Sequence, residues 1–452
     1  MKMSAEEYGR RVRRVGPPSP LGRDCLWAFG VGGGICLLGE VLRGWYLTMG
    51  LDKELAGTLT SCTLVALSAL LTTLGLYQKL AAKAGAGTLV PITGFANAVV
   101  SAAIEFKAEG RVLGTGAKMF TIAGPVIVYG TLAAVGGKKE GEGPLAAAFD
   151  ELSSDNRFGQ SSWEAAEKYL QLRAARLCLQ KAQLPEEKVR LVLAGDLQAQ
   201  CTASGYAMRE LGVPFAGVFG ACSTMAETLG LGAALCASGA AEHLLAMASS
   251  HFCAAERQFR TPLSYGAVRT PTAQWTVTAA GCCLLQPAGP GVPIAAATFG
   301  RVQDYQVRDI NNMGAAMAPA AASTLLHYFA DTHTEPQEFD CIYTGDLGQV
   351  GSSLLRELLA AEGLLVKNHV DCGCILFDAA EQQVKSGGSG PGCCAAVLCG
   401  HILPRLLRRS QKRVLFVATG ALMSQTTFLQ KESIPAVAHL VELRAPEKES
   451  GA

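Results

Sequence analysis

A cysteine at a predicted strand-to-helix turn is the residue of this sequence best placed for chemistry. Cys222 lies in the run GACST at 220–224, after an apolar stretch at 215–219 and before a helical stretch at 223–237. Free N–H groups and the helix dipole at a helix N-terminus stabilise a thiolate and lower the pKa of the thiol. The pattern therefore indicates a nucleophile or a pocket residue, and its plainer alternative is a cysteine that packs at the start of a helix.

Two arginines close to a strand end offer a second kind of chemistry. Arg257 and Arg260 follow His251, which itself comes just after an apolar stretch at 244–248. Guanidinium groups suit planar, bidentate recognition of carboxylates. The run therefore suggests a carboxylate-binding group near a pocket, and a surface helix with salt bridges is the alternative.

Elements that alternate between strand and helix must position these residues. From about residue 141, short apolar runs are separated by helical stretches, which is typical of a mainly parallel sheet with helices on its faces. The second part repeats the first, so we predict an α/β thiolase-like fold with duplicated βαβαβ halves and a ligand site between them at strand carboxyl ends. The predicted strands are 189–194, 244–248, 341–347 and 414–420, and the predicted helices include 163–182 and 223–237.

Acyl transfer by Cys222 would need polar partners for the thiol, and few are found. The strand end where ketoacyl synthases carry a histidine has Asp346 here, and the glycine-rich loop at 387–394 contains neither histidine nor asparagine. His251 does not match a catalytic position. We therefore expect a retained pocket without catalytic residues, and we predict no cofactor and no metal site.

The first 137 residues are apolar enough to cross a membrane. The stretches 58–77, 84–104 and 119–137 carry no charge and are each about 20 residues long, as a bilayer core of roughly 30 Å requires. A fourth stretch, 26–46, is interrupted by two charges. Basic residues before 26–46, between 58–77 and 84–104, and after 119–137 predict about four spans with both ends cytoplasmic. A buried helical bundle in a soluble domain is the alternative.

Polar and helix-breaking residues interrupt the apolar stretch 84–104. Pro91 and Asn97 lie within it, and Glu105 follows directly. Where a helix is interrupted within the membrane, its free backbone N–H and C=O groups need hydrogen-bond partners from protein or from a water-filled cavity. A charged residue at that depth marks a solute path. These residues are candidates for such a path, and a kinked helix that packs closely through its glycines is the alternative.

Composition excludes some partners. A formal net charge of +1 and the lack of a long basic stripe argue against nucleic acid as a partner. The 16 cysteines are scattered and show no repeated zinc-ligand spacing. We expect them to be reduced thiols in a reducing compartment.

The interrupted stretch and its surroundings resemble a known membrane family. The runs at 90–97, 101–110 and 118–127 are similar to stage V sporulation protein AC, over roughly residues 5–130. That family comprises small membrane proteins of spore-forming Firmicutes that are implicated in moving dipicolinic acid across the spore inner membrane. The resemblance implies that residues 25–137 form a membrane-embedded helical domain.

The remainder resembles a second family, stage V sporulation protein AD, from about residue 136 to 442. This family has a thiolase-like fold without established catalysis and is implicated in binding dipicolinic acid during its uptake into the developing spore. The resemblance implies that six residues lie near the pocket: Cys222, Ser223, His251, Arg257, Arg260 and Asp346. The matching stretches are 219–227, 249–260, 271–278, 312–321, 344–347 and 432–435.

These observations predict a non-enzymatic, multi-pass membrane component that binds and transports dipicolinic acid or its calcium chelate across the spore inner membrane or forespore membrane. The expected partners are this ligand, other stage V sporulation A membrane proteins, the lipid bilayer and a second copy through the thiolase-like domain. Calcium would enter only with the ligand. One alternative is a thiolase or ketoacyl-synthase-like acyl-transfer enzyme that uses Cys222. Another is a scaffold for transport subunits.

The junction between the two resemblances indicates a gene fusion. Residues 1–24 form a basic tail, 25–137 the membrane domain and 138–452 the thiolase-like domain. The usual first strand of the second family has no clear counterpart near the junction. Loss of that strand would expose a sheet edge.

Overall fold

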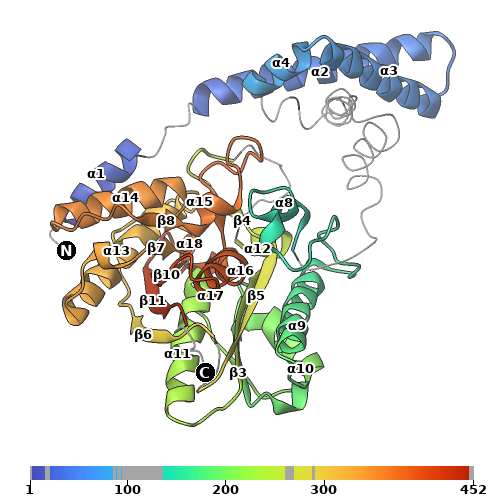
Figure 1. Cartoon of the computed structure of the whole chain (residues 1–452). Coiled ribbons are helices and arrows are strands. Elements are labelled where there is room, and N and C mark those ends of the chain that lie inside the picture. The colour runs from blue at the N-terminus through green and yellow to red at the C-terminus, as the bar shows by residue number, and fades with distance from the viewer. Residues whose placement is uncertain are drawn as a thin grey trace. The chain divides into compact units, whose positions relative to one another are not determined.

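The computed structural model describes residues 3–15, 21–84, 88, 93, 136–259, 269–287 and 291–446. These residues form two compact units (Figure 1). The smaller unit holds helices α2 to α4. The larger unit holds α1 (Ala5–Val15) together with every described element from α8 (Lys138–Gly141) onward.

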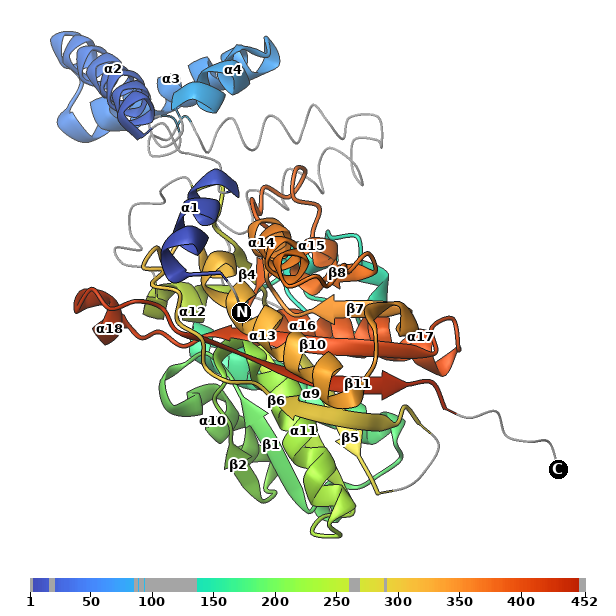
Figure 2. The same cartoon turned by 90° about the vertical axis from the view of Figure 1, so that its left-hand side faces the viewer.

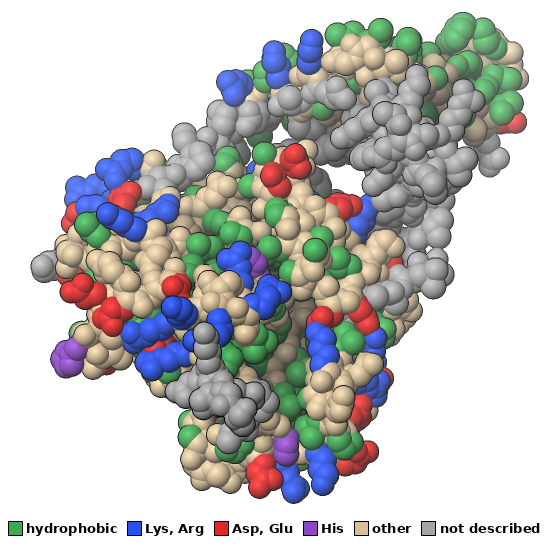
Figure 3. Space-filling view, viewed as in Figure 1, with side chains coloured by type: hydrophobic (Ala, Val, Ile, Leu, Met, Phe, Trp, Pro, Cys, Tyr) green, Lys and Arg blue, Asp and Glu red, His purple; other side chains and the backbone are tan. Residues whose placement is uncertain are grey.

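The smaller unit contains two helices that are long and apolar enough to cross a membrane. These helices are α2 (Leu21–Thr48) and α3 (Lys53–Thr73), followed by the short α4 (Leu76–Ala84). Hydrophobic side chains cover much of their exposed surface (Figure 3). Their length and composition support membrane association.

The second predicted span begins and ends earlier than expected. The side chain of Asp52 accepts a hydrogen bond from the backbone of Leu55 and so caps the start of α3. Near the other end, Gly75 adopts a left-handed φ of 67°, which separates α3 from α4. The predicted runs 84–104 and 119–137, with Pro91, Asn97 and Glu105, lie almost wholly outside the described residues.

The first half of the larger unit contains a mixed sheet. Its strand order is β2-β1-β3-β5, with β1, β2 and β3 parallel and β5 antiparallel to β3. In the central strand, Val192 pairs with Phe215 on one side and Leu245 on the other. The strands are β1 (Leu191–Gly195), β2 (Phe215–Gly217), β3 (Leu244–Ser250) and β5 (Ala279–Leu285).

The second half contains a larger sheet with the order β6-β11-β10-β7-β8. Strands β10, β7 and β8 are parallel, and β11 runs antiparallel to both β10 and β6, as Figure 2 shows for the long β10 and β11. The strands are β6 (Ile294–Phe299), β7 (Cys341–Thr344), β8 (His369–Asp371), β10 (Arg413–Ala421) and β11 (Ala436–Arg444).

Helices separate and cover the two sheets. Helix α11 contacts β3, β10 and β11, and α16 contacts β3 and β5, so both lie between the sheets. Helix α9 covers the outer face of the first sheet, and α13 with α14 covers that of the second. The helices are α9 (Trp163–Lys181), α10 (Thr202–Leu211), α11 (Thr224–Ala237), α12 (Phe252–Phe259), α13 (Met313–Thr332), α14 (Gly348–Ala361), α15 (Cys372–Leu376), α16 (Pro391–Val397), α17 (Leu403–Leu407) and α18 (Gln425–Leu429).

The apolar core follows from the pleat of the central strands. Ala246 and Ala248 of β3 face the layer between the sheets, whereas Leu245 and Met247 face the outer helices. Such alternation is the consequence of a strand that is buried on both faces. The layered architecture with two similar halves confirms the predicted thiolase-like fold with duplicated βαβαβ halves.

The two halves differ at one sheet edge. In the second half, β11 pairs with β10 on one side and with β6 on the other. In the first half, β5 pairs with β3, and the described residues contain no strand on its other side. The described part of the first half therefore shows no counterpart of β6.

The two halves meet closely at the turn that carries Cys222. A Cβ atom added to Gly420 of β10 would lie 2.1 Å from the carbonyl oxygen of Gly220. We expect Gly420→Ala to lower the stability of the larger unit by about 1–3 kcal/mol, because backbone atoms on both sides would have to move apart. Thermal unfolding of the purified full chain in detergent measures this loss.

Gly205→Ala is the matched control, since nothing lies within 4 Å of the Cβ position at this glycine of α10. Its unfolding midpoint should stay equal or rise slightly, as expected for glycine replacement in a helix. Equal midpoints for both variants and the native chain would contradict the close approach.

Candidate functional site

Cys222 lies in a tight turn between β2 and α11. The turn is a short 3-10 segment, Ala221–Ser223, and Ala221 takes a φ of 50°, which is rare for a residue with a side chain. The thiol is almost buried, with 8% of the residue exposed. The predicted position of this cysteine at the start of a helix is therefore confirmed.

The electrostatic environment of the Cys222 thiol differs from the prediction. Burial, followed by the negative charge of the adjacent Asp346 carboxyl, raises the pKa of Cys222 well above its ordinary value. The predicted lowering by the helix N-terminus is wrong, because desolvation and a like charge both disfavour the thiolate. The thiol therefore stays protonated and hydrogen-bonds to Asp346.

Asp346 is a buried carboxyl that links several elements. Thr419 of β10 donates to it at 2.8 Å, and Ser389 and the backbone N–H of Gly390 donate at 3.0 Å each. Burial raises the pKa of Asp346, and these hydrogen bonds and the one from Cys222 oppose that rise. The carboxyl therefore already accepts several hydrogen bonds from neighbouring elements.

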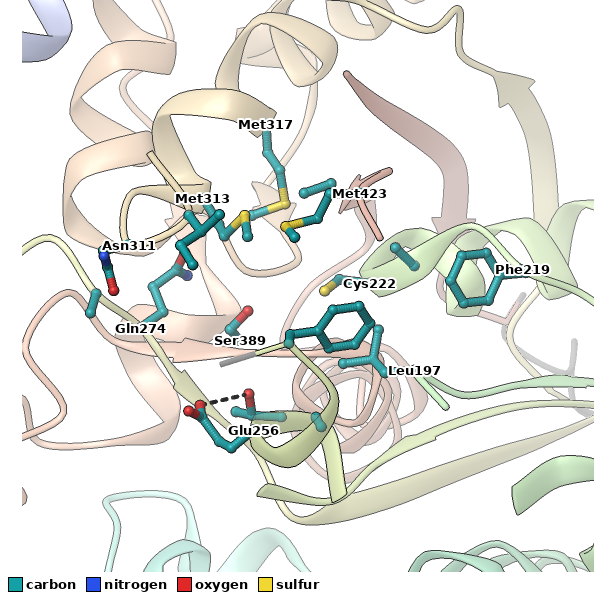
Figure 4. Close-up of a pocket in the computed structure, with 17 residues that line it drawn as sticks. Leu197, Phe219, Cys222, Glu256, Gln274, Asn311, Met313, Met317, Ser389 and Met423 are labelled. Carbon is teal, nitrogen blue, oxygen red and sulfur yellow. Dashed lines mark hydrogen bonds between the residues drawn. The ribbon is translucent and has the colours of Figure 1, made fainter. Parts of the chain in front are cut away.

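A pocket of about 110 Å³ opens beside Cys222 (Figure 4). Methionines of α13 and of the segment after β10 lie on one side, and Glu256 of α12 lies on the opposite side. The lining residues are Leu197, Phe219, Ala221, Cys222, Ala255, Glu256, Phe259, Ala273, Gln274, Thr276, Ile310, Asn311, Met313, Met317, Ser389, Ala421 and Met423.

The pocket is mostly apolar and carries one acidic group. Its described lining contains no lysine or arginine, and Glu256 is its only carboxyl. Thr276 donates to Glu256 at 3.5 Å, and Gln274 donates to the carbonyl oxygens of Asp346 and Gly388. Such a lining suits a flat apolar ligand with a few polar atoms.

The other predicted pocket residues lie outside this lining. Ser223 is buried and donates to the carbonyl oxygen of Gly220 at 2.6 Å. His251 is buried, bonds through Nε2 to the carbonyl oxygen of Asn156 at 2.7 Å, and has its pKa lowered to about 4 by burial. Asp346 lies behind Cys222 rather than on the pocket surface.

The two arginines do not come together in the described structure. Arg257 is exposed and forms an ion pair with Glu164 of α9. Arg260 lies outside the described residues. The described side chains also contain no group of three or more histidine, cysteine, aspartate or glutamate residues that could hold a metal ion.

Sequence reasoning missed the methionine wall formed by Met313, Met317 and Met423. Met313 and Met317 belong to the run 312–321, which is part of the family resemblance. This run is apolar on all sides of its helix, so the sequence does not indicate which face borders a cavity. Glu256 precedes Arg257 in the sequence, and no pattern there marks it as a pocket residue.

Two family models match this chain. Residues 116–444 match the family described as Stage V sporulation protein AD, and residues 24–136 match the SpoVAC/SpoVAEB sporulation membrane protein family. Stage V sporulation protein AD of Bacillus subtilis (strain 168) is 41% identical over 326 residues, which is 72% of this chain and 96% of the relative. Stage V sporulation protein AC of the same organism is 45% identical over 130 residues, or 28% of this chain and 87% of the relative.

Solved structures of condensing enzymes also show similarity. The chain matches 3-oxoacyl-[acyl-carrier-protein] synthase III from Aquifex aeolicus VF5 at 12% identity and a TM-score of 0.41, covering 61% of this chain and 84% of that one. The corresponding enzyme from Pseudomonas aeruginosa PAO1 matches at 16% identity and a TM-score of 0.41, covering 62% and 84%. Similarity at this level does not bear on function.

The pairing of Cys222 with Asp346 predicts slow alkylation of this thiol. We expect Asp346→Asn to speed the reaction of Cys222 with iodoacetamide at pH 8 severalfold, because removal of a nearby negative charge lowers the pKa of the thiol and increases its thiolate fraction. Peptide mapping by mass spectrometry measures the rate at Cys222 separately from the other cysteines.

Asp331→Asn, a change at an exposed position on α13, is the control and should leave the rate unchanged. If native Cys222 reacted as fast as an exposed cysteine, or if Asp346→Asn had no effect in a folded protein, the assigned environment of the thiol would be wrong.

Proposed function

The chain belongs to the stage V sporulation protein AD family and carries, in the same polypeptide, a membrane segment of the stage V sporulation protein AC type. From this membership we propose that it is a membrane-attached, non-enzymatic binding and transport component for dipicolinic acid in the spore inner membrane or forespore membrane. The pocket beside Cys222 is the proposed binding site.

The environment of Cys222 is the observation that carries the non-enzymatic part. A nucleophilic cysteine needs a base or a positive charge that favours its thiolate. Here the thiol faces a buried carboxyl that raises its pKa, and the one histidine predicted near the site is neutral and bonded elsewhere. These features support ligand contact by the thiol and oppose acyl transfer.

The pocket lining supports an aromatic ligand in neutral form. Methionine sulfur and phenylalanine rings make favourable contacts with an aromatic ring such as that of a pyridine dicarboxylate. The described lining offers no cation to a free dianion and places Glu256 against it. Because burial of an unpaired charge is costly, the calcium chelate, whose charges cancel, fits this pocket better than the free dianion.

The membrane part supplies attachment in this proposal. Helices α2 and α3 have the length and composition to cross the bilayer. A path for the ligand through Pro91, Asn97 and Glu105 stays a proposal, as do association with other stage V sporulation A membrane proteins, pairing of two copies through the thiolase-like domain and a cytoplasmic position of that domain.

Acyl transfer is the second candidate, because Cys222 does line a pocket. An enzyme of this type would carry the acyl group on Cys222 as a thioester. Incubation of the full chain with labelled acyl-CoA, followed by peptide mapping, should yield no thioester at Cys222. A stable thioester would favour the enzyme and sink the non-enzymatic proposal.

Titration calorimetry of the full chain in detergent tests ligand binding. We expect saturable heat with pyridine-2,6-dicarboxylate in the presence of calcium, and weaker binding in its absence. Ala421→Phe should weaken binding by about tenfold or more, since the ring would fill much of the pocket beside Cys222.

Ala182→Phe, at an exposed position after α9, is the matched control and should bind like the native chain. Absence of heat with either form of the ligand would contradict the proposal and favour the scaffold alternative. Equal affinity of Ala421→Phe and the native chain would place the ligand elsewhere.

A further inference from the structure

The N-terminal helix α1 packs on the larger unit, although the apolar helices α2 and α3 separate the two in the sequence. Both cartoon views place α1 beside α14 (Figures 1 and 2), and the two helices are in contact. Basic side chains gather over α1, whose basic residues are all arginines (Figure 3). We call residues 3–15 the N-terminal arm.

Ion pairs hold the C-terminal end of the arm. Arg11 and Arg14 both reach Glu357 of α14, at 3.2 and 2.8 Å from the same carboxylate oxygen. Arg11 also pairs with Glu7 within α1 at 3.3 Å. The arginines that the sequence assigned to a basic tail therefore include two that face a carboxylate of the larger unit.

Apolar contact holds the other end of the arm. Met3 is 6% exposed and belongs to the hydrophobic cluster formed by α13, α14 and the second sheet. The hydroxyl of Tyr305 donates to the carbonyl oxygen of Met3 at 3.4 Å. Exposed ion pairs alone contribute little to stability. Burial of the Met3 side chain therefore adds an apolar contact that helps to hold the arm on the larger unit.

The docking restricts how the chain can cross a membrane. The arm and the larger unit must lie on the same side of the bilayer if they touch, and the apolar helices α2 and α3 fall between them in the sequence. We propose that the surface formed by Glu357, Tyr305 and the apolar cluster that surrounds Met3 is the docking site of the chain's own N-terminal arm, and that this docking keeps the arm and the larger unit on the same side of the membrane.

This proposal makes no use of the ligand and holds whichever side of the membrane carries the larger unit. The proposal also has a different basis from the prediction made from basic residues. That prediction uses the distribution of lysine and arginine on either side of the membrane, whereas the proposal uses contacts of the arm within the protein. If the arm and the larger unit lay on opposite sides of the membrane, Met3 and both arginines would lose these partners.

Protease protection in sealed vesicles tests whether both ends of the chain lie on the same side of the membrane. The full chain carries one epitope tag at its N-terminus and another at its C-terminus, and right-side-out and inside-out vesicles are treated with protease. Both tags should be digested in one preparation and protected in the other. Digestion of one tag with protection of the other would overturn the proposal.

Hydrogen–deuterium exchange of the arm tests the docking itself. In the full chain in detergent, Glu357→Arg should speed exchange of the peptide covering residues 3–15 by roughly threefold or more, because both arginines lose their partner. The triple variant Arg11→Glu, Arg14→Glu, Glu357→Arg should restore slow exchange, which also shows that the change at 357 leaves the larger unit folded.

Glu187→Arg is the matched control, an exposed charge reversal in the other half of the larger unit, and should leave exchange of the arm unchanged. If the native arm exchanged as fast as a free peptide, or if Glu357→Arg and the triple variant both matched the native rate, the proposed docking site would be wrong.

Discussion

The hydrogen bonds around the Asp346 carboxyl are the interaction on which the site depends. Donors reach it from β10, from the glycine-rich loop and from the Cys222 thiol of the other half. A buried carboxyl without such partners would destabilise the fold, whereas a satisfied one fixes its neighbours in a single arrangement. The same group that joins the halves thus keeps the thiol protonated. Architecture and the proposed lack of catalysis therefore share one cause.

Much of the fold follows from the sequence. The apolar runs that predicted strands at 189–194 and 414–420 correspond to β1 and β10, and Cys222 lies at the predicted turn. The raised pKa of Cys222 could not be predicted from the sequence, because burial of the thiol and its contact with Asp346 depend on how the two halves pack. The position of His251 against the Asn156 carbonyl and the methionine wall are likewise tertiary properties, which local patterns do not contain.

The two family matches meet in the sequence without a gap. The two family matches overlap over residues 116–136, so one segment is shared between a membrane family and a thiolase-like family. In the described residues, the first sheet ends at β5, whereas in the second sheet the equivalent strand β11 pairs with a further strand, β6. The N-terminal arm precedes the apolar helices in the sequence but packs within the larger unit.

The central claim, that the pocket beside Cys222 binds calcium dipicolinate, is tested most directly by methionine oxidation. Peroxide treatment of the full chain with and without the ligand, followed by peptide mapping, reports on Met313 and Met423 of the pocket and on Met49, which is exposed at the end of α2. The account predicts slower oxidation of Met313 and Met423 with ligand and no change at Met49. Equal rates at the two pocket methionines under saturating ligand would contradict it.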